Sequence, residues 1–224
     1  MPRKRRAIVF DLDGTLIDSV PDIHRTLNRV LDEAGRHPVG IEAVKLMVGD
    51  GARVLVEKGF AATGPALDAA SLDRAYGRFL ACYEGPETAG LTRPYPGVRA
   101  TLEWLLDRGF RLGICTNKPK TATADVLDRL DLARFFDAVV TPEQVSAHKP
   151  HPAHLLATLA VLRAEPAEAV MVGDNANDVA VAHGAGVPVI AVTYGYPRMA
   201  PADLGADLLI DEMAALPAAL DRLA

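Results

Sequence analysis

Two aspartates, Asp11 and Asp13, stand two residues apart directly after an apolar run at residues 7–10. Side chains alternate along a strand, so a strand continuing through the pair would turn both carboxylates to one side and Leu12 to the other. Two like charges held close together are costly unless a cation or a shared proton relieves the repulsion. The pair therefore suits metal-assisted phosphoryl transfer, with a divalent cation between the two carboxylates.

Each aspartate has a distinct task in such a reaction. Asp11 is the expected nucleophile, which would form an aspartyl-phosphate. Asp13 is the expected general acid and base, which would protonate the leaving oxygen and later deprotonate water. The plainer interpretation is a turn at the end of a strand, because Asp and Gly are common turn residues and Gly14 permits a sharp bend.

The composition is typical of a globular enzyme and argues against a nucleic-acid-binding protein. The 224 residues are 50% hydrophobic and 24% charged, with a net charge of −5, and this length allows one large domain or two modest ones. Nucleic-acid-binding proteins usually have a basic face, whereas the basic cluster here, residues 2–6, is expected to be a solvated terminus. No apolar run is long enough for a membrane span, so neither nucleic acid nor membrane is an expected partner.

The only cysteines, Cys82 and Cys115, lie far apart in the sequence. Two cysteines do not make a disulfide framework, so we expect a cytoplasmic protein with both thiols reduced. The sequence leaves open whether the protein is a monomer or a homodimer.

Two patterns follow the aspartate pair. Apolar residues first recur at helical spacing, with no strand expected between residues 16 and 90. The segments with helical spacing are residues 17–31, 41–48, 52–61 and 66–83. After a connection rich in Gly and Pro, residues 85–97, helices alternate with Val- and Ile-rich strands. Such alternation is typical of a parallel, doubly wound sheet.

We therefore predict an α/β fold with a doubly wound, Rossmann-like parallel sheet. Residues 1–17 and 90–224 would form this core, and residues 18–89 an all-helical cap inserted after the first strand. The predicted core strands are 7–10, 111–115, 138–141, 169–172, 187–192 and 208–210. The predicted core helices are 98–107, 120–130, 153–162 and 176–183, followed by a last helix.

Ligands of such sheets bind beyond the carboxyl ends of the strands, and polar residues of this chain gather there. Thr116 and Asn117 follow one strand, and we expect them to hydrogen-bond phosphoryl oxygens. Lys149, just before a helix, would neutralise phosphoryl charge and restrain Asp11. In isolation, each of these residues also fits a turn or the protein surface.

Asp174 follows a later strand, and we expect it to bind Mg²⁺, which needs few protein carboxylates. Asp178 stands in the first turn of the next helix. It is a candidate metal ligand, an outer partner of the ligands, or a residue that complements the helix dipole.

Four segments together resemble the phosphatases of the haloacid dehalogenase superfamily. They are FDLDGTLIDS at residues 10–19, TNK at 116–118, KP at 149–150 and GDNAND at 173–178. The resemblance covers nearly the whole chain, and Asn175 stands where Ser is the more usual choice. Narrower similarity to the phosphoglycolate-hydrolysing branch comes from DSVPD at 18–22, VGDGA at 48–52, PYPG at 94–97 and TYGY at 193–196.

The resemblance implies a Mg²⁺-dependent phosphomonoesterase with a small helical cap. Its expected substrate is a small phosphorylated acid, 2-phosphoglycolate, hydrolysed through an aspartyl-phosphate. The resemblance also implies that Asp11 and Asp174 bind Mg²⁺ by their side chains and Asp13 by its backbone carbonyl.

Other functions would use the same core. A phosphosugar mutase is the nearest alternative, and a nucleotide phosphatase or a pyrophosphatase is another, because the core does not select the substrate. Phosphonate cleavage is not expected, since those relatives place a small residue where Asp13 stands. A non-catalytic phosphate-binding module would not need Asp11, Asp13, Lys149 and Asp174 together.

Substrate selectivity is expected to come from the helical insertion. The insertion begins a few residues after Asp13 and could close over the site. Gly49 and Gly51 stand at an expected helix N-terminus, followed by Arg53 one turn in. Backbone N–H groups and an arginine suit a carboxylate, so Arg53 is a candidate substrate-binding residue. A solvated surface arginine is the alternative.

Overall fold

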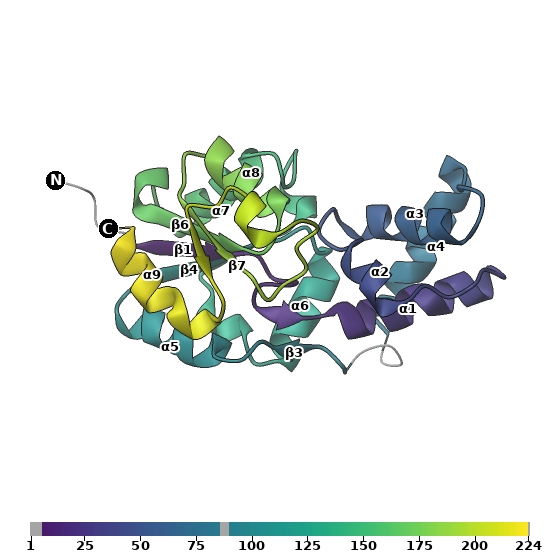
Figure 1. Ribbon diagram of the computed structural model, residues 1–224, viewed down its shortest axis with the longest axis horizontal. Helices are drawn as coiled ribbons and strands as arrows, with labels where there is room; N and C mark the ends of the chain where they lie inside the picture. Colours follow the sequence, from purple (N-terminus) through teal and green to yellow (C-terminus); the bar gives the residue numbers. More distant parts are fainter. Residues whose placement is uncertain (1–5, 86–89, 224) are drawn as a thin grey trace.

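The computed structural model describes residues 6–85 and 90–223 (Figure 1). Residues 2–5 of the basic cluster, predicted to be a solvated terminus, lie outside the described residues. Residues 86–89 of the predicted Gly- and Pro-rich connection lie outside them as well. None of the described helices is both long and apolar enough to span a membrane.

A six-stranded parallel sheet forms the core, in the order β5-β4-β1-β6-β7-β8. The strands are β1 (Ala7–Phe10), β4 (Arg111–Cys115), β5 (Ala138–Val140), β6 (Ala169–Gly173), β7 (Val189–Val192) and β8 (Leu208–Ile210). β1 lies near the centre, between β4 and β6. The predicted α/β fold with a parallel sheet is confirmed.

Helices cover both faces of this sheet. They are α5 (Val98–Asp107), α6 (Lys120–Arg129) and α9 (Leu216–Arg222) on one face, and α7 (Ala153–Leu162) and α8 (Ala176–Gly184) on the other. Along β1, Ile8 and Phe10 join one hydrophobic cluster and Ala7 and Val9 the other. A strand buried on both sides reads as an unbroken apolar run, which is why the sequence predicted the six strands of this sheet to within two residues.

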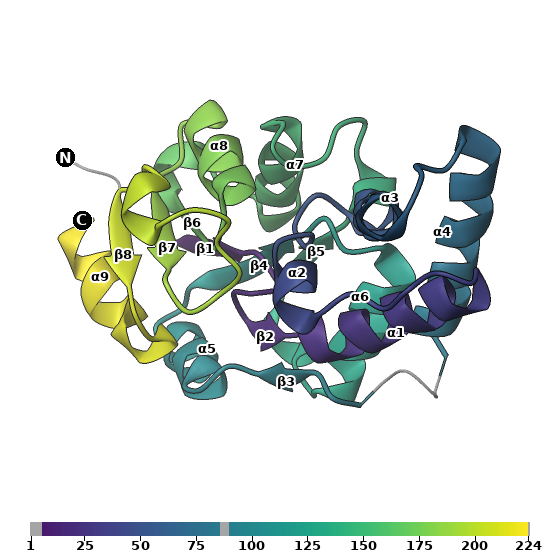
Figure 2. The same ribbon diagram turned by 45° about the vertical axis from the view of Figure 1, so that its right-hand side comes forward.

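Four described helices form a separate cluster beside the sheet (Figures 1 and 2). They are α1 (Val20–Glu33), α2 (Ile41–Lys45), α3 (Ala52–Thr63) and α4 (Ala69–Tyr83). Leu27 of α1, Val56 of α3 and Phe79 of α4 are buried in their shared core. A Cβ atom on Gly59 would lie 2.8 Å from Cδ1 of Leu27, so a small residue lets α1 and α3 approach closely.

A two-stranded antiparallel ribbon lies where the chain passes between sheet and helices. It pairs β2 (Ile17–Asp18) with β3 (Arg93–Pro94). The expectation of no strand between residues 16 and 90 is therefore wrong, because two residues are too few to show alternation and the partner is remote in sequence. Ser19 occupies the N-cap position of α1, but its side chain makes no capping hydrogen bond.

Candidate active site

The aspartate pair lies where β1 ends. The backbone N–H of Asp11 donates to the carbonyl of Val172 in β6 at 2.9 Å, so pairing with the sheet continues one residue past the strand. Asp13 lies in the turn that follows. Although the strand ends at Phe10, both carboxylates line the same pocket.

Gly14 allows this turn to approach Asp174. Its φ is +91°, and a Cβ atom there would lie 2.4 Å from Oδ2 of Asp174, so glycine is the residue that fits. Asp174 is fully buried at the end of β6. Its Oδ1 accepts a 3.1 Å hydrogen bond from Thr15 Oγ1, and its Oδ2 accepts a 2.8 Å bond from the backbone N–H of Tyr196. The turn after β1 and the loop after β7 thus meet at this carboxylate.

Lys149 reaches the site from the loop before α7. Its Nζ lies 2.7 Å from Oδ1 of Asp11 and 2.7 Å from Oδ1 of Asp178, and its side chain is almost fully buried. Burial alone would lower the pKa of Lys149, but the charges of Asp11 and Asp178 outweigh burial and raise it. The side chain is therefore a permanent cation that restrains the Asp11 carboxylate.

Asp178 uses both of its carboxylate oxygens within the protein. Oδ1 accepts from Lys149, and Oδ2 accepts from the backbone N–H groups of Asp174 and Asn175 at 3.1 and 3.2 Å. Together with Asn175 it forms a capping box at the start of α8. Asp178 thus lies in the first turn of α8, in contact with Lys149 and with the backbone of Asp174, and its part in metal binding stays a prediction.

Three carboxylates crowd together in this buried region. Oxygen atoms of Asp11, Asp174 and Asp178 all lie within 4.8 Å of one another. Burial raises the pKa of Asp11 and of Asp174, and the repulsion among the three carboxylates adds to it. Since one ammonium, Lys149, faces three carboxylates, the ionised cluster has a charge of minus two. Hard oxygen ligands with this excess charge fit a divalent cation.

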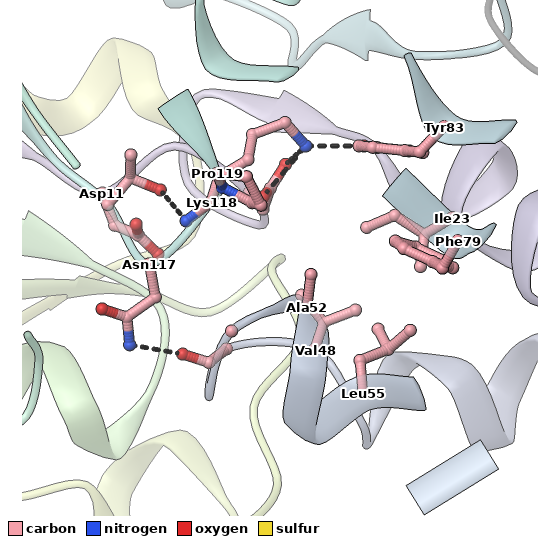
Figure 3. Close-up of a pocket in the computed structure, with 14 residues that line it drawn as sticks. Asp11, Ile23, Val48, Ala52, Leu55, Phe79, Tyr83, Asn117, Lys118 and Pro119 are labelled. Atoms are coloured by element: carbon pink, nitrogen blue, oxygen red, sulfur yellow. Dashed lines mark hydrogen bonds and ion pairs between the residues drawn. The ribbon is translucent and has the colours of Figure 1, made fainter. Parts of the chain in front are cut away.

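A pocket of about 480 Å³, counted to its mouth, opens between this end of the sheet and the helical insertion (Figure 3). The core side contributes Asp11, Asp13, Thr116, Asn117, Lys118 and Pro119. The insertion contributes Ile23, Val48, Gly49, Gly51, Ala52, Leu55, Phe79 and Tyr83. Polar groups on the sheet side face an apolar wall on the insertion side, and small-molecule sites commonly combine the two.

Thr116 and Asn117 lie at the end of β4 and line this pocket, as the sequence predicted. The Asn117 side-chain amide, however, donates to the carbonyl of Gly49 at 2.9 Å (Figure 3). It also donates to the carbonyl of Lys149 at 3.0 Å. Both of its amide protons are therefore already used, and it joins the insertion to the Lys149 loop. The structure gives this side chain a bridging position rather than a free donor for phosphoryl oxygens.

Arg53 does not reach the pocket. Its guanidinium is half-exposed and lies 2.8 Å from Asp73 of α4. Successive helical residues point about 100° apart, and Ala52 is the one of the two that faces the pocket. The structure therefore does not bring Arg53 together with the other predicted site residues.

Sequence reasoning missed Lys118 and Tyr83. The Nζ of Lys118 lies 3.1 Å from Oδ1 of Asp13 and 2.5 Å from the hydroxyl of Tyr83 (Figure 3). Lys118 belongs to the TNK segment, where its charge was the available signal. Nothing in the sequence of α4 distinguished Tyr83 from a core aromatic.

Comparisons with known proteins agree with this geometry. The sequence model of the family described as haloacid dehalogenase-like hydrolase matches residues 8–192. A phosphoglycolate phosphatase of Rhodospirillum rubrum is 44% identical over 216 residues, covering 94% of this chain and 89% of the relative. One from Agrobacterium fabrum is 38% identical, covering 96% and 92%. The solved structure of a predicted phosphoglycolate phosphatase from Haemophilus somnus matches with a TM-score of 0.90 at 28% identity, covering 97% and 98%.

Proposed function

This chain belongs to the haloacid dehalogenase-like hydrolase family, and from that premise we propose that it hydrolyses 2-phosphoglycolate to glycolate and phosphate with Mg²⁺ as its metal. The family and the relatives identify the enzyme as a phosphatase. The observation that carries the proposal is the buried contact of Lys149 with Asp11, 2.7 Å long, beside the carboxylate of Asp174. The carboxylate proposed as the nucleophile thus lies beside a buried cation and beside carboxylates that suit a divalent metal, which supports the proposal.

In the first step, an oxygen of Asp11 attacks phosphorus and the bond from phosphorus to the ester oxygen breaks. Asp13, which lines the same pocket, donates a proton to that oxygen, so that glycolate leaves. Lys149 keeps the Asp11 carboxylate oriented and adds positive charge beside it.

In the second step, water attacks the phosphorus of the aspartyl-phosphate while Asp13 takes its proton. The bond between phosphorus and Asp11 breaks, and phosphate and the original carboxylate are regenerated. Asp11 and Asp174 would hold the Mg²⁺, with the backbone carbonyl of Asp13 as a further ligand. The bound cation supplies positive charge toward the phosphoryl oxygens.

The helical insertion, residues 18–89, is proposed to act as a cap. Its apolar residues form one wall of the pocket, and the Asn117 amide joins its Gly49 carbonyl to the core. Such a cap excludes water from the aspartyl-phosphate until the leaving group has gone. The pocket is lined by both Asp11 and Asp13, which supports a phosphate ester as the substrate. The names of the relatives indicate 2-phosphoglycolate.

The test is phosphate release from a panel of phosphate esters, with pyrophosphate as an anhydride, by the full chain with Mg²⁺. The panel is 2-phosphoglycolate, ethyl phosphate, glucose 6-phosphate, β-glucose 1-phosphate, AMP and pyrophosphate. We expect kcat/KM for 2-phosphoglycolate to exceed that for every other substrate by at least about tenfold. A higher kcat/KM for another ester would replace the proposed substrate. Isomerisation of β-glucose 1-phosphate without phosphate release would indicate a mutase.

A further inference from the structure

Lys118 joins the core to the helical insertion inside the pocket. Its side chain is 3% exposed, and its Nζ lies 3.1 and 3.3 Å from the two carboxylate oxygens of Asp13. On the opposite side, Nζ donates to the hydroxyl of Tyr83, the last residue of α4 (Figure 3). The ammonium group therefore lies between the expected general acid and the apolar wall of the insertion.

Lys118 is also the one cationic side chain among the described residues that line the pocket. Lys149 is not part of the pocket wall and is already shared by Asp11 and Asp178. Arg53 lies at the surface with Asp73. A carboxylate that enters a largely apolar pocket needs a charged or hydrogen-bonding partner, because an unpaired buried charge is costly. Lys118 is the charged partner that the described pocket wall offers.

The distances place this ammonium within reach of a 2-phosphoglycolate carboxylate. A general acid donates over about 3 Å, so with Asp13 poised on the ester oxygen, Nζ of Lys118 lies at most about 6 Å from that oxygen. One methylene group separates the ester oxygen from the carboxylate carbon. The carboxylate oxygens therefore extend about 3 Å beyond the ester oxygen, which leaves a hydrogen-bond length to Nζ.

Tyr83 provides a second donor. Its hydroxyl oxygen accepts from Lys118, and within residues 6–85 and 90–223 its own proton has no acceptor. A carboxylate placed between Nζ and this hydroxyl would accept from both, while Nζ keeps its contact with Asp13. Because Lys118 belongs to the core and Tyr83 to α4, both groups could bind one carboxylate only while α4 lies over the core.

We propose that Lys118, with the Tyr83 hydroxyl, binds the substrate carboxylate and selects 2-phosphoglycolate over esters of similar size that lack an acid. The inference rests on the proposed function. A purely structural Lys118 that only orients Asp13 would act on all esters alike, so the two roles differ in how they affect substrate selectivity.

The experiment compares kcat/KM for 2-phosphoglycolate with kcat/KM for ethyl phosphate, whose alkoxide leaving group also needs a proton. The variant is Lys118→Met, which keeps the aliphatic chain. We expect the ratio of the two constants to fall about 10- to 100-fold, the effect of losing a charged hydrogen bond. Lys120→Met, at an exposed lysine two residues away, is the matched control and should keep the wild-type ratio.

Binding gives a second measurement that does not depend on turnover. In calorimetry with Mg²⁺, 3-phosphonopropionate should bind wild type more tightly than propylphosphonate does, and Lys118→Met should remove this difference. Tyr83→Phe keeps the ring and should lower the kinetic ratio about 3- to 10-fold. If circular dichroism shows that Lys118→Met does not fold, the kinetic ratio of Tyr83→Phe tests the proposal instead.

The possible failures are distinguishable. A wild-type enzyme that does not prefer 2-phosphoglycolate over ethyl phosphate overturns the proposed function, and the inference with it. If folded Lys118→Met keeps the wild-type preference, the role of Lys118 is overturned and the proposed function stands. If Lys118→Met does not fold, the same preference in Tyr83→Phe has this consequence. Equal losses on both esters would reduce Lys118 to a residue that positions Asp13.

Discussion

The side-chain amide of Asn177, in the first turn of α8, donates a 2.7 Å hydrogen bond to Oδ1 of Asp50, in the loop between α2 and α3. The other oxygen of Asp50 lies 2.6 Å from Nζ of Lys58 and 2.7 Å from a guanidinium nitrogen of Arg198. Burial would raise the pKa of Asp50, but these donors lower it to about 2, so the carboxylate stays ionised. Two separate core segments thus fasten one loop of the insertion beside the pocket.

Replacing Asp50 by alanine should loosen this attachment and lower catalytic efficiency. We expect kcat/KM for 2-phosphoglycolate to fall about tenfold in Asp50→Ala, because closure of the insertion completes the site. Hydrogen exchange at residues 48–52 should become faster in the same variant. Asp73→Ala, which removes the exposed partner of Arg53, is the control. If the two variants were equally active, the attachment at Asp50 would have no part in catalysis.

Asp11→Asn should abolish turnover while the protein stays folded. An amide is a poor nucleophile, and the loss should exceed about 10³-fold in phosphate release. Far-ultraviolet circular dichroism and the melting temperature would verify the fold. Residual activity within about tenfold of wild type would exclude Asp11 as the nucleophile.

The core and most of its polar residues were predictable because parallel strands bring their carboxyl ends to one edge. Asp11 and Asp13 follow β1, Thr116 follows β4 and Asp174 follows β6, and these three strands are parallel, so their ends meet at one edge of the sheet. Apolar runs and turn residues indicate where each strand ends, and the carboxyl ends of parallel strands are where ligands of such sheets bind.

The contacts between core and insertion were not predictable in this way. Lys118 meets Tyr83, and Asn177 meets Asp50, across segments that share no periodic pattern. Which face of α3 borders the pocket depends on how the insertion docks, and a rotation of one residue exchanges Ala52 for Arg53. That rotation is why the candidate role of Arg53 found no support in the geometry.

Arg53→Ala should therefore leave selectivity nearly unchanged. Its ion pair with Asp73 is exposed, and exposed pairs contribute little to stability. We expect KM for 2-phosphoglycolate and for an aryl phosphate to change less than about twofold. A rise in KM confined to 2-phosphoglycolate would restore Arg53 as a substrate-binding residue.

Removing divalent metal should eliminate activity, and Mg²⁺ should restore it. The carboxylates of Asp11 and Asp174 are hard oxygen ligands with no thiolate or imidazole beside them, which favours Mg²⁺ over Zn²⁺. Mg²⁺ should also raise the melting temperature of the wild type by binding the folded state. Asp174→Ala should need far more Mg²⁺ for activity and lose most of this thermal shift. Full activity after exhaustive chelation would contradict a metal-dependent reaction.

His154 makes the stability of this fold depend on pH. The imidazole is fully buried, and its Nδ1 accepts a 3.2 Å hydrogen bond from the backbone N–H of Lys149. Nε2 therefore carries the proton and donates to the carbonyl of Val140 at 3.1 Å. Burial, followed by the charge of Lys149, lowers the pKa of His154 to about 4. Protonation of Nδ1 would break the contact that shapes the Lys149 loop.

The pKa of His154 in the folded state lies below its ordinary value, so the neutral imidazole stabilises the fold. This stability is fully present above about pH 6.5 and is lost on acidification toward pH 4. Between pH 7 and pH 5 this loss amounts to about 2 kcal/mol in the free energy of unfolding. The raised pKa values of Asp11 and Asp174 act in the opposite direction, so wild type must be compared with His154→Gln under the same metal-free conditions. Urea unfolding should show the free-energy difference between the two proteins shrinking by that amount at pH 5. A constant difference between wild type and His154→Gln across this range would mean that His154 titrates alike in the folded and unfolded states.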